Sequence, residues 1–147
     1  MEFNIEIKAP RKEVWEVLFG KETYPIWTKA FSEGSRVETD WKKGSKALFL
    51  DGQNRGMVSK IAENVPNEFM SIEHLGYYKD GQEDYETAKK ENWAGAKENY
   101  TLTDLNGQTN LHIFMEMNET EENKQMIDMF ADMWPKALAK VKELAER

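Results

Sequence analysis

Residues 125–141, QMIDMFADMWPKALAKV, decide how this chain is expected to fold. Their apolar positions recur as in a helix, but they spread over roughly half of the helical wheel. A helix on the surface of a domain needs a narrower stripe, whereas this width suits a helix held by a strongly curved sheet. The apolar side chains are also bulky in the first half and compact in the second. The bulky ones are Met126, Met129, Phe130, Met133 and Trp134, and the compact ones are Ala137, Leu138 and Val141.

Pro135 lies at the join between these halves. Proline removes one i to i−4 hydrogen bond, so a kink is predicted here. Methionine is flexible and is common on surfaces that adapt to what they bind. We therefore expect the compact half to pack tightly on a sheet and the bulky half to roof a cavity. The alternative is that the bulky side chains fill an ordinary core.

The rest of the chain predicts the sheet. Residues 3–7 alternate apolar and polar side chains as a half-buried strand does, and residues 11–19 read as a helix that stops at Gly20. Residues 21–31 predict a second short helical piece. After residue 35, short alternating segments are separated by turns, and Asn106-Gly107 is a strong hairpin signal. The predicted fold is α+β: a curved antiparallel sheet of about six to seven strands, two short helices after the first strand, and a long C-terminal helix that begins near Asn118 or Thr120.

Residues 76–96 show no clear period and carry many charges. They also contain four large aromatic side chains, which disfavour plain disorder. A loop of this length in a compact domain usually covers a binding site or moves, so we expect a mobile loop that gates entry. We expect residues 1–147 to form one domain.

The composition excludes several classes of partner. The chain has 20 basic and 27 acidic residues, a net charge of −7, which disfavours binding to nucleic-acid phosphates. It has no cysteine, so disulfides and thiolate metal sites are excluded. No apolar run approaches the length of a membrane span, and the N-terminus lacks the pattern of a secretory signal. We therefore expect a cytoplasmic protein with no membrane partner.

One histidine is a candidate for chemistry. His74 shares strand parity with Met70 and Ile72, so it is expected to point inward, whereas His112 is expected to point outward. Tyr100 has inward parity on the next strand. A histidine near a tyrosine in an apolar cavity can act as an acid or base, although a core histidine satisfied by hydrogen bonds is the simpler interpretation. No set of side chains has metal-ligand spacing, and no cofactor motif is present.

Several ordered segments resemble a known family. These are IKAPRKEVWEVL after the first strand, YPIW, DWKKGSKALF, RGMVSKIAENVPNEFMSIEHLG and ENYTLTDLNGQTNLHI, followed by a terminal helix with Trp134. Together they resemble the START-like (SRPBCC) helix-grip superfamily, and within it the activator-of-heat-shock-protein-ninety-ATPase-like (Aha C-terminal-domain-like) family. The resemblance implies a sheet wrapped around the long helix. It also implies a deep cavity between them, which in relatives binds small hydrophobic molecules.

The predicted function is therefore the binding of a small hydrophobic molecule, with no cofactor and no metal. Two alternatives stay open: a cyclase or isomerase that uses His74, and a stress-related protein-interaction domain like a co-chaperone. Related co-chaperones carry a separate domain that engages the chaperone, so a chaperone partner is disfavoured, while a homodimer is left open. The residues expected to contact the ligand are Trp27, Phe49, Ile72, His74, Tyr100, Ile113, Met115, Met126, Met129, Phe130, Met133 and Trp134.

Overall fold

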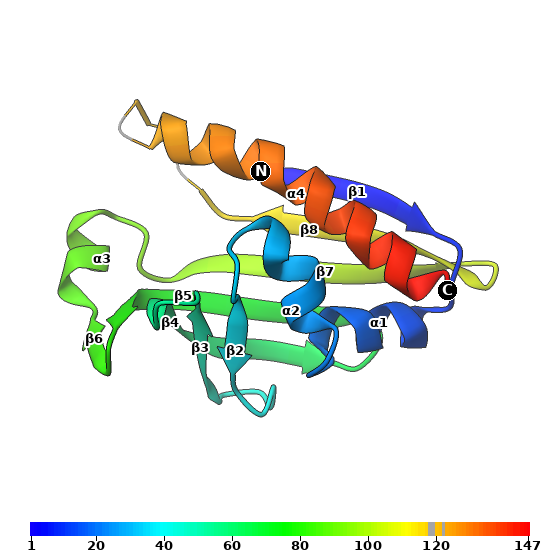
Figure 1. Ribbon diagram of the computed structural model, residues 1–147, viewed down its shortest axis with the longest axis horizontal. Helices are drawn as coiled ribbons and strands as arrows, with labels where there is room; N and C mark the ends of the chain where they lie inside the picture. The colour runs from blue at the N-terminus through cyan, green and yellow to red at the C-terminus, as the bar shows by residue number, and fades with distance from the viewer. Residues whose placement is uncertain (118–119, 122) are drawn as a thin grey trace.

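The computed structural model describes residues 1–117, 120–121 and 123–147. The chain begins with one strand and continues with a short helical section. A long run of strands follows, interrupted by one short helix, and the chain ends in a long helix (Figure 1). The elements are β1 (Glu2–Ile7), α1 (Arg11–Phe19), α2 (Tyr24–Trp27), the 3-10 turn η1 (Thr28–Ala30), β2 (Arg36–Glu38), β3 (Lys46–Leu50), β4 (Arg55–Val65), β5 (Phe69–Lys79), β6 (Gln82–Asp84), α3 (Glu86–Lys90), β7 (Ala96–Leu105), β8 (Gln108–Met115) and α4 (Lys124–Ala145).

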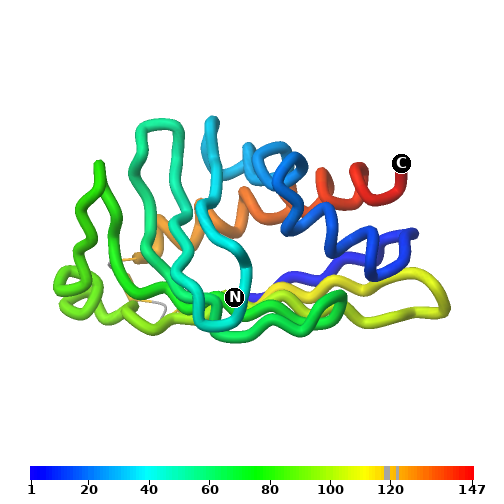
Figure 2. The backbone as a smooth tube through the Cα atoms, turned by 90° about the horizontal axis from the view of Figure 1, so that it is seen from below, coloured from blue at the N-terminus to red at the C-terminus, as the bar shows by residue number. Residues whose placement is uncertain are grey.

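The strands form one antiparallel sheet in the order β1-β8-β7-β5-β4-β3-β2, and β6 pairs with β5 beside this path. Helices α1, α2 and α4 lie on the same side of the sheet, which we call the inner face (Figure 2). The β3–β4 and β5–β6 hairpins rise on that side too. The prediction of an α+β fold with a long C-terminal helix is confirmed. The predicted strand number is too low, because the described part of the sheet has eight strands.

The extra strand comes from the segment that was predicted to be a loop. Asp80 and Gly81 have φ angles of 48° and 87°, and two successive positive φ values make the tight turn that joins β5 to β6. Asp84, the last residue of β6, then holds the first turn of α3, since its carboxylate accepts the Thr87 backbone N–H at 3.0 Å and the Thr87 hydroxyl at 2.6 Å. Local hydrogen bonding therefore builds a hairpin and a short helix where periodicity alone showed nothing.

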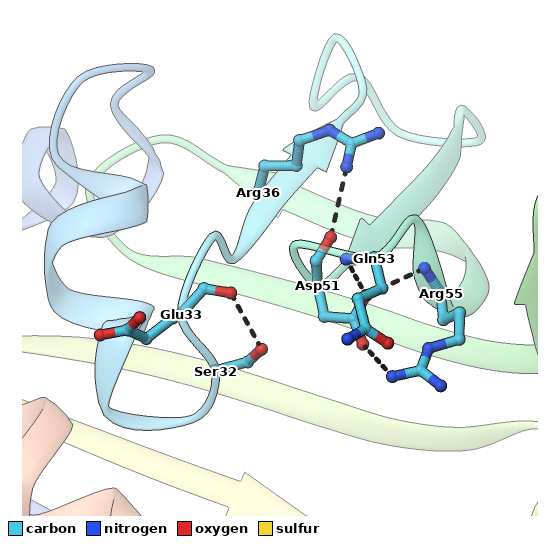
Figure 3. Close-up of polar contacts among 6 residues, drawn as sticks. All are labelled: Ser32, Glu33, Arg36, Asp51, Gln53 and Arg55. Atoms are coloured by element: carbon cyan, nitrogen blue, oxygen red, sulfur yellow. Dashed lines mark hydrogen bonds and ion pairs between the residues drawn. The ribbon is translucent and has the colours of Figure 1, made fainter.

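The turn between β3 and β4 is held by Asp51 (Figure 3). Its Oδ1 accepts the backbone N–H groups of Gln53 at 2.8 Å and Arg55 at 3.0 Å. Backbone hydrogen bonds from Arg55 and Gln53 lower the pKa of the Asp51 carboxyl. Arg36 of β2 donates to the Asp51 carbonyl oxygen at 3.4 Å, so the turn is also tied to the edge strand. In the same view, the Ser32 hydroxyl donates to the carbonyl oxygen of Glu33.

Helix α4 begins later than predicted, and it runs as one helix through Pro135. Thr120 and Asn123 bond to each other ahead of it: the Thr120 N–H donates to Asn123 Oδ1 at 2.8 Å, and the Asn123 N–H donates to Thr120 Oγ1 at 3.3 Å. This pair closes a turn before the helix, so Thr120 does not cap α4. The other predicted start, Asn118, lies outside the described residues. None of the helices in the ranges described above is long and apolar enough to cross a membrane.

The core lies between the inner face and the helices. In α4 the compact half is buried as predicted, with Ala137, Leu138 and Val141 at most 3% exposed. The bulky half differs along its length, because Trp134 is 3% exposed whereas Met126 and Met129 are 44% and 53% exposed. The start of α4 therefore stands away from the core. The residues that are essentially inaccessible include Ile7, Leu18, Trp27, Ile61, Met70, Ile72, Leu111, Ile113 and Val141.

A buried hydroxyl ties β8 to the start of α1, and its removal should be measurable. Thr109 is fully buried, and its Oγ1 donates to the Ala9 carbonyl oxygen at 2.7 Å. Thr109→Val keeps the shape but leaves that carbonyl oxygen without the bond. We expect the free energy of unfolding to fall by about 1–2 kcal/mol in urea titrations. The exposed Thr103 of β7 is the matched control, and equal losses for Thr103→Val and Thr109→Val would contradict this role.

Candidate functional site

Four polar side chains form a connected chain on the inner face, which we call the polar quartet. Ser59 comes from β4, His74 from β5, and Glu98 and Tyr100 from β7. Ser59 Oγ lies 2.7 Å from His74 Nδ1, and His74 Nε2 lies 3.2 Å from Glu98 Oε1. The Tyr100 hydroxyl donates to the other Glu98 oxygen, Oε2. Every member is thus hydrogen-bonded to a neighbour, as buried polar groups require.

Strand register brings these side chains together. His74 pairs with Ser59 across β4–β5 and with Ala96 across β5–β7, and Glu98 is two residues further along β7 on the same face. The β4–β5 pairing is irregular between Val58 and Ser59, where the extra residue lies on β5. Ser59 itself alternates regularly along β4 with the buried Ile61, so ordinary alternation places it on the inner face beside the imidazole.

The electrostatics keep Glu98 ionised and the neighbouring phenols protonated. Burial raises the pKa of Glu98, but the hydrogen bond and positive charge of His74 and the hydrogen bond from Tyr100 outweigh it, so the pKa lies below the ordinary value. Burial and the Glu98 charge raise the pKa values of Tyr24 and Tyr100. A carboxylate at Glu98 requires a proton on His74 Nε2, so in a neutral ring Nδ1 accepts from the Ser59 hydroxyl.

Aromatic rings fill the interior beside the quartet. The Trp134 ring centroid lies 4.9 Å from Phe31, 6.2 Å from Trp27 and 6.2 Å from Tyr100. At the level of Trp134, therefore, α4 covers a filled core. The two buried indoles differ in one respect. Trp27 Nε1 donates to the Leu18 carbonyl oxygen at 3.1 Å, whereas Trp134 Nε1 is buried and has no hydrogen-bond partner among the described residues.

Next to Trp134, toward the first half of α4, lies a set of apolar side chains that are only half buried, and we call this set the apolar mouth. The ring centroids of Phe130 and Phe31 lie 6.5 Å apart. The Phe49 ring centroid lies 5.9 Å from that of His74, and Met115 is directly opposite Glu98 across β7–β8. The apolar mouth thus adjoins the polar quartet on two sides. Its members are Phe31, Phe49, Met115 and Phe130, which pack against the core, and we add Met133, which is half buried one turn after Phe130 on α4.

The residues predicted to contact a ligand fall into three groups. Met126 and Met129 are exposed at the start of α4. Phe49, Met115, Phe130 and Met133 are half buried in the apolar mouth, and the other six are buried: Trp27, Ile72, His74, Tyr100, Ile113 and Trp134.

Sequence reasoning missed Ser59, Glu98 and Tyr24. Glu98 has the same strand parity as Tyr100, so alternation alone would have placed it on the inner face. His74 points inward as predicted, while His112 is half buried and lies 3.3 Å from Glu2.

Two hollows lie away from the apolar mouth. One, of about 240 Å³, is lined by residues of α1 together with Trp41, Asn64 and Met70. The other, of about 360 Å³, lies between α1 and the end of α4. The part of the chain that the structure describes contains no group of three or more side chains able to hold a metal ion.

The quartet has the bonding order serine, histidine, carboxylate, which also occurs in hydrolases. Ser59 is only 1% exposed, however, and its oxygen is held by the imidazole. A substrate carbonyl cannot approach it. The arrangement is better suited to presenting hydrogen-bonding groups beside an apolar surface than to nucleophilic attack.

The antiparallel sheet, the short helices after its first strand and the long C-terminal helix define the START-like (SRPBCC) class of folds. The family model described as "Activator of Hsp90 ATPase homolog 1-like protein" matches residues 8–146, and the chain belongs to this family. The resemblance read from the sequence is thereby confirmed. A search of curated proteins found no match.

Several solved structures are similar to this chain. MLL2253 from Mesorhizobium loti is 13% identical with a TM-score of 0.73, and the match covers 98% of this chain and 94% of that one. Aha1 from Colwellia psychrerythraea, described as a dimer, is 19% identical with a TM-score of 0.72, covering 99% and 95%. DynU16, from the dynemicin biosynthetic locus, is 12% identical with a TM-score of 0.69, covering 97% of this chain and 45% of DynU16. At these low sequence identities, the structural likeness establishes the fold alone.

Proposed function

We propose that this chain binds a small molecule that has an apolar body and one hydrogen-bond acceptor, between the first half of α4 and the inner face. The observation that carries the proposal is the buried Trp134 Nε1–H, which has no partner in the described structure. Leaving a buried donor unpaired costs about 1–3 kcal/mol, so its persistence calls for a reason. An acceptor on a ligand would satisfy it.

The surroundings of Trp134 support this proposal. The apolar mouth supplies aromatic and methionine side chains, and methionine adapts to ligands of different shape. The polar quartet supplies a few fixed hydrogen-bonding groups, and Tyr100 keeps lone pairs free to accept after donating to Glu98. Binding sites for small molecules usually combine a mostly apolar wall with a few such groups.

The same proposal includes the wider architecture. The sheet would grip α4 along its length, residues 1–147 would act as one unit in the cytoplasm, and no metal or cofactor would take part. We extend the dimeric state described for Colwellia Aha1 to this chain, with the exposed Met126 and Met129 covered by a second copy. Sedimentation of the purified chain at micromolar concentration tests this assembly.

An enzyme of the cyclase or isomerase type is the second candidate, and the contact of His74 with Glu98 favours it. An imidazole oriented by a carboxylate can move protons. Both ring nitrogens of His74 are occupied, so it would have to release Ser59 before it could act on a substrate. Loss of turnover in His74→Ala, with ligand binding kept, would select this reading over simple binding.

A matched pair of probes tests the binding proposal. 2-Acetylnaphthalene carries a carbonyl acceptor, and 2-ethylnaphthalene has nearly the same shape without it. We expect the ketone to raise the melting temperature, because a ligand of the folded state stabilises it. We also expect it to bind about five- to tenfold more tightly than the hydrocarbon, as one hydrogen bond allows. In Trp134→Phe the two probes should bind equally.

Blocking the apolar mouth should abolish binding of both probes. Met133→Trp adds bulk at a half-buried position, and we expect the affinity to fall at least about tenfold, while overpacking costs at most about 1–3 kcal/mol of stability. Leu105→Trp, at an exposed position on the β7–β8 hairpin, is the control and should bind like the wild type. If the wild-type chain binds neither probe, the proposal fails.

A further inference from the structure

The hollow of about 240 Å³ is lined by three aromatic rings, which we call the aromatic cage: Trp15, Phe19 and Trp41. The ring centroids of Trp15 and Phe19 lie 4.8 Å apart, and those of Phe19 and Trp41 lie 4.9 Å apart. Met70 completes the apolar lining. The volume is below the range of about 300–1,000 Å³ usual for drug-sized ligands, so a group of only a few heavy atoms fits.

Two side chains at this hollow, Asn64 and Glu16, offer acceptor oxygens that have no partner among the described residues. Asn64 Oδ1 is buried and has no hydrogen-bond partner among the residues described. Its orientation is fixed, because Asn64 Nδ2 donates to the Trp41 carbonyl oxygen at 2.7 Å. The exposed carboxylate of Glu16 also lines the hollow, and within the described ranges it forms no ion pair. A carbonyl oxygen and a carboxylate beside three aromatic rings attract a cation that can donate a hydrogen bond.

Trp41 has an unusual backbone conformation that supports the same conclusion. Its φ angle is 62°, which is rare for a bulky side chain and costs conformational energy. Two hydrogen bonds hold it there: the Trp41 N–H donates to Thr39 Oγ1 at 3.2 Å, and its carbonyl oxygen accepts from Asn64. Such strain is typical of positions whose side chain must be placed for binding.

We propose that the aromatic cage binds a small organic ammonium ion that keeps at least one N–H. The alkyl groups contact the ring faces, where the aromatic quadrupole attracts positive charge. The N–H donates to Asn64 Oδ1, and Glu16 contributes the balancing charge. The net charge of −7 raises the local concentration of cations. This site shares no residue with the apolar mouth, so it does not depend on the binding function proposed above.

Three probes separate charge from hydrogen bonding. N,N-Dimethylethanolamine is protonated at neutral pH and keeps one N–H, choline has the charge but no N–H, and 3,3-dimethyl-1-butanol is the neutral analogue of choline. Titrations followed by the indole N–H signals of Trp15 and Trp41 should give this order of affinity, from tightest to weakest. We expect choline to bind at least about fivefold more tightly than the alcohol. The proposal would be overturned if the alcohol bound as tightly as the amine.

Two variants assign the contacts. Glu16→Gln, on an exposed side chain, should weaken both cations about three- to fivefold and leave the alcohol unchanged. Glu73→Gln, on the opposite face of the sheet, removes the same charge and should change nothing. Asn64→Leu should remove the advantage of the amine over choline. If Glu16→Gln and Glu73→Gln weakened cation binding equally, the attraction would come from the overall negative charge of the protein, and the proposed site would be wrong.

The same ammonium group occurs on lipid headgroups, and the size of the hollow favours a free small cation. Vesicles of phosphatidylethanolamine should therefore not co-sediment with the protein. Co-sedimentation without binding of the free amine would contradict the assignment.

Discussion

Trp27→Ala is expected to lower the free energy of unfolding by about 3–5 kcal/mol, the range for removing a buried aromatic side chain. The Trp27 ring is 1% exposed and lies within 6.4 Å of the rings of Tyr24, Phe31 and Trp134. Its loss also leaves the Leu18 carbonyl oxygen without its hydrogen bond. Urea unfolding, followed by circular dichroism, measures the change.

The two buried indoles provide a matched control for this result. Trp27→Phe removes a hydrogen-bonded N–H, whereas Trp134→Phe removes one that has no partner in the described structure. We expect Trp27→Phe to cost about 1–2 kcal/mol more than Trp134→Phe. Equal costs would contradict the different hydrogen bonding of the two indoles.

Glu98→Leu is the second large effect, with an expected loss of about 3–5 kcal/mol, as for other buried pairs that lose one partner. The Glu98 side chain is 15% exposed, and its two oxygens hold His74 and Tyr100 in place. The double variant His74→Leu with Glu98→Leu should be more stable than Glu98→Leu alone, because no unpaired imidazole remains. Glu73→Leu, on the outer face of the same sheet, is the control and should cost less than about 1 kcal/mol. A similar loss at both positions would contradict the role of the quartet.

The stabilisation from Glu98 should also depend on pH in a definite direction. Its pKa is lowered in the folded state, so it stabilises the fold above the unfolded pKa of about 4.3. This contribution is lost as the pH falls through the folded pKa, because the unfolded chain then binds the proton more readily. The stability difference between wild type and Glu98→Gln should therefore be full at pH 7 and shrink below about pH 4. A constant difference from pH 7 to pH 3 would contradict this account.

The order and type of most elements could be predicted from the sequence, because alternation and turn residues act locally. Asn106 and Gly107 show this, since both have positive φ and close the β7–β8 hairpin. Asp80 and Gly81 carry the same signal and join β5 to β6, a strand that the periodicity of residues 76–96 does not predict. The predicted start of α4 is too early, because the side chains of Thr120 and Asn123 bond to each other's backbone N–H groups and not to those of the helix.

The candidate site could be predicted only in part. Parity placed His74 and Tyr100 on the inner face, and it would have placed Glu98 there too. Periodicity gives the direction of a side chain but not how far its neighbours fill the space beside it. The exposure of Met126 and Met129, the packing of rings around Trp134 and the pairing of Ser59 with His74 all depend on the curvature and register of the sheet. These are properties of the assembled fold.

The most direct test of ligand binding beneath α4 is the indole N–H spectrum of the chain, which has five tryptophans. Trp134→Phe assigns the Trp134 signal, and Trp93, whose Nε1 donates to Glu91 at 3.1 Å, is the internal control. On addition of 2-acetylnaphthalene, the Trp134 N–H should move downfield and exchange more slowly with solvent, since it gains a hydrogen-bond acceptor. The Trp93 signal should stay in place, and 2-ethylnaphthalene should produce no downfield shift at Trp134. A Trp134 signal that does not change at saturating ketone would contradict the proposed site.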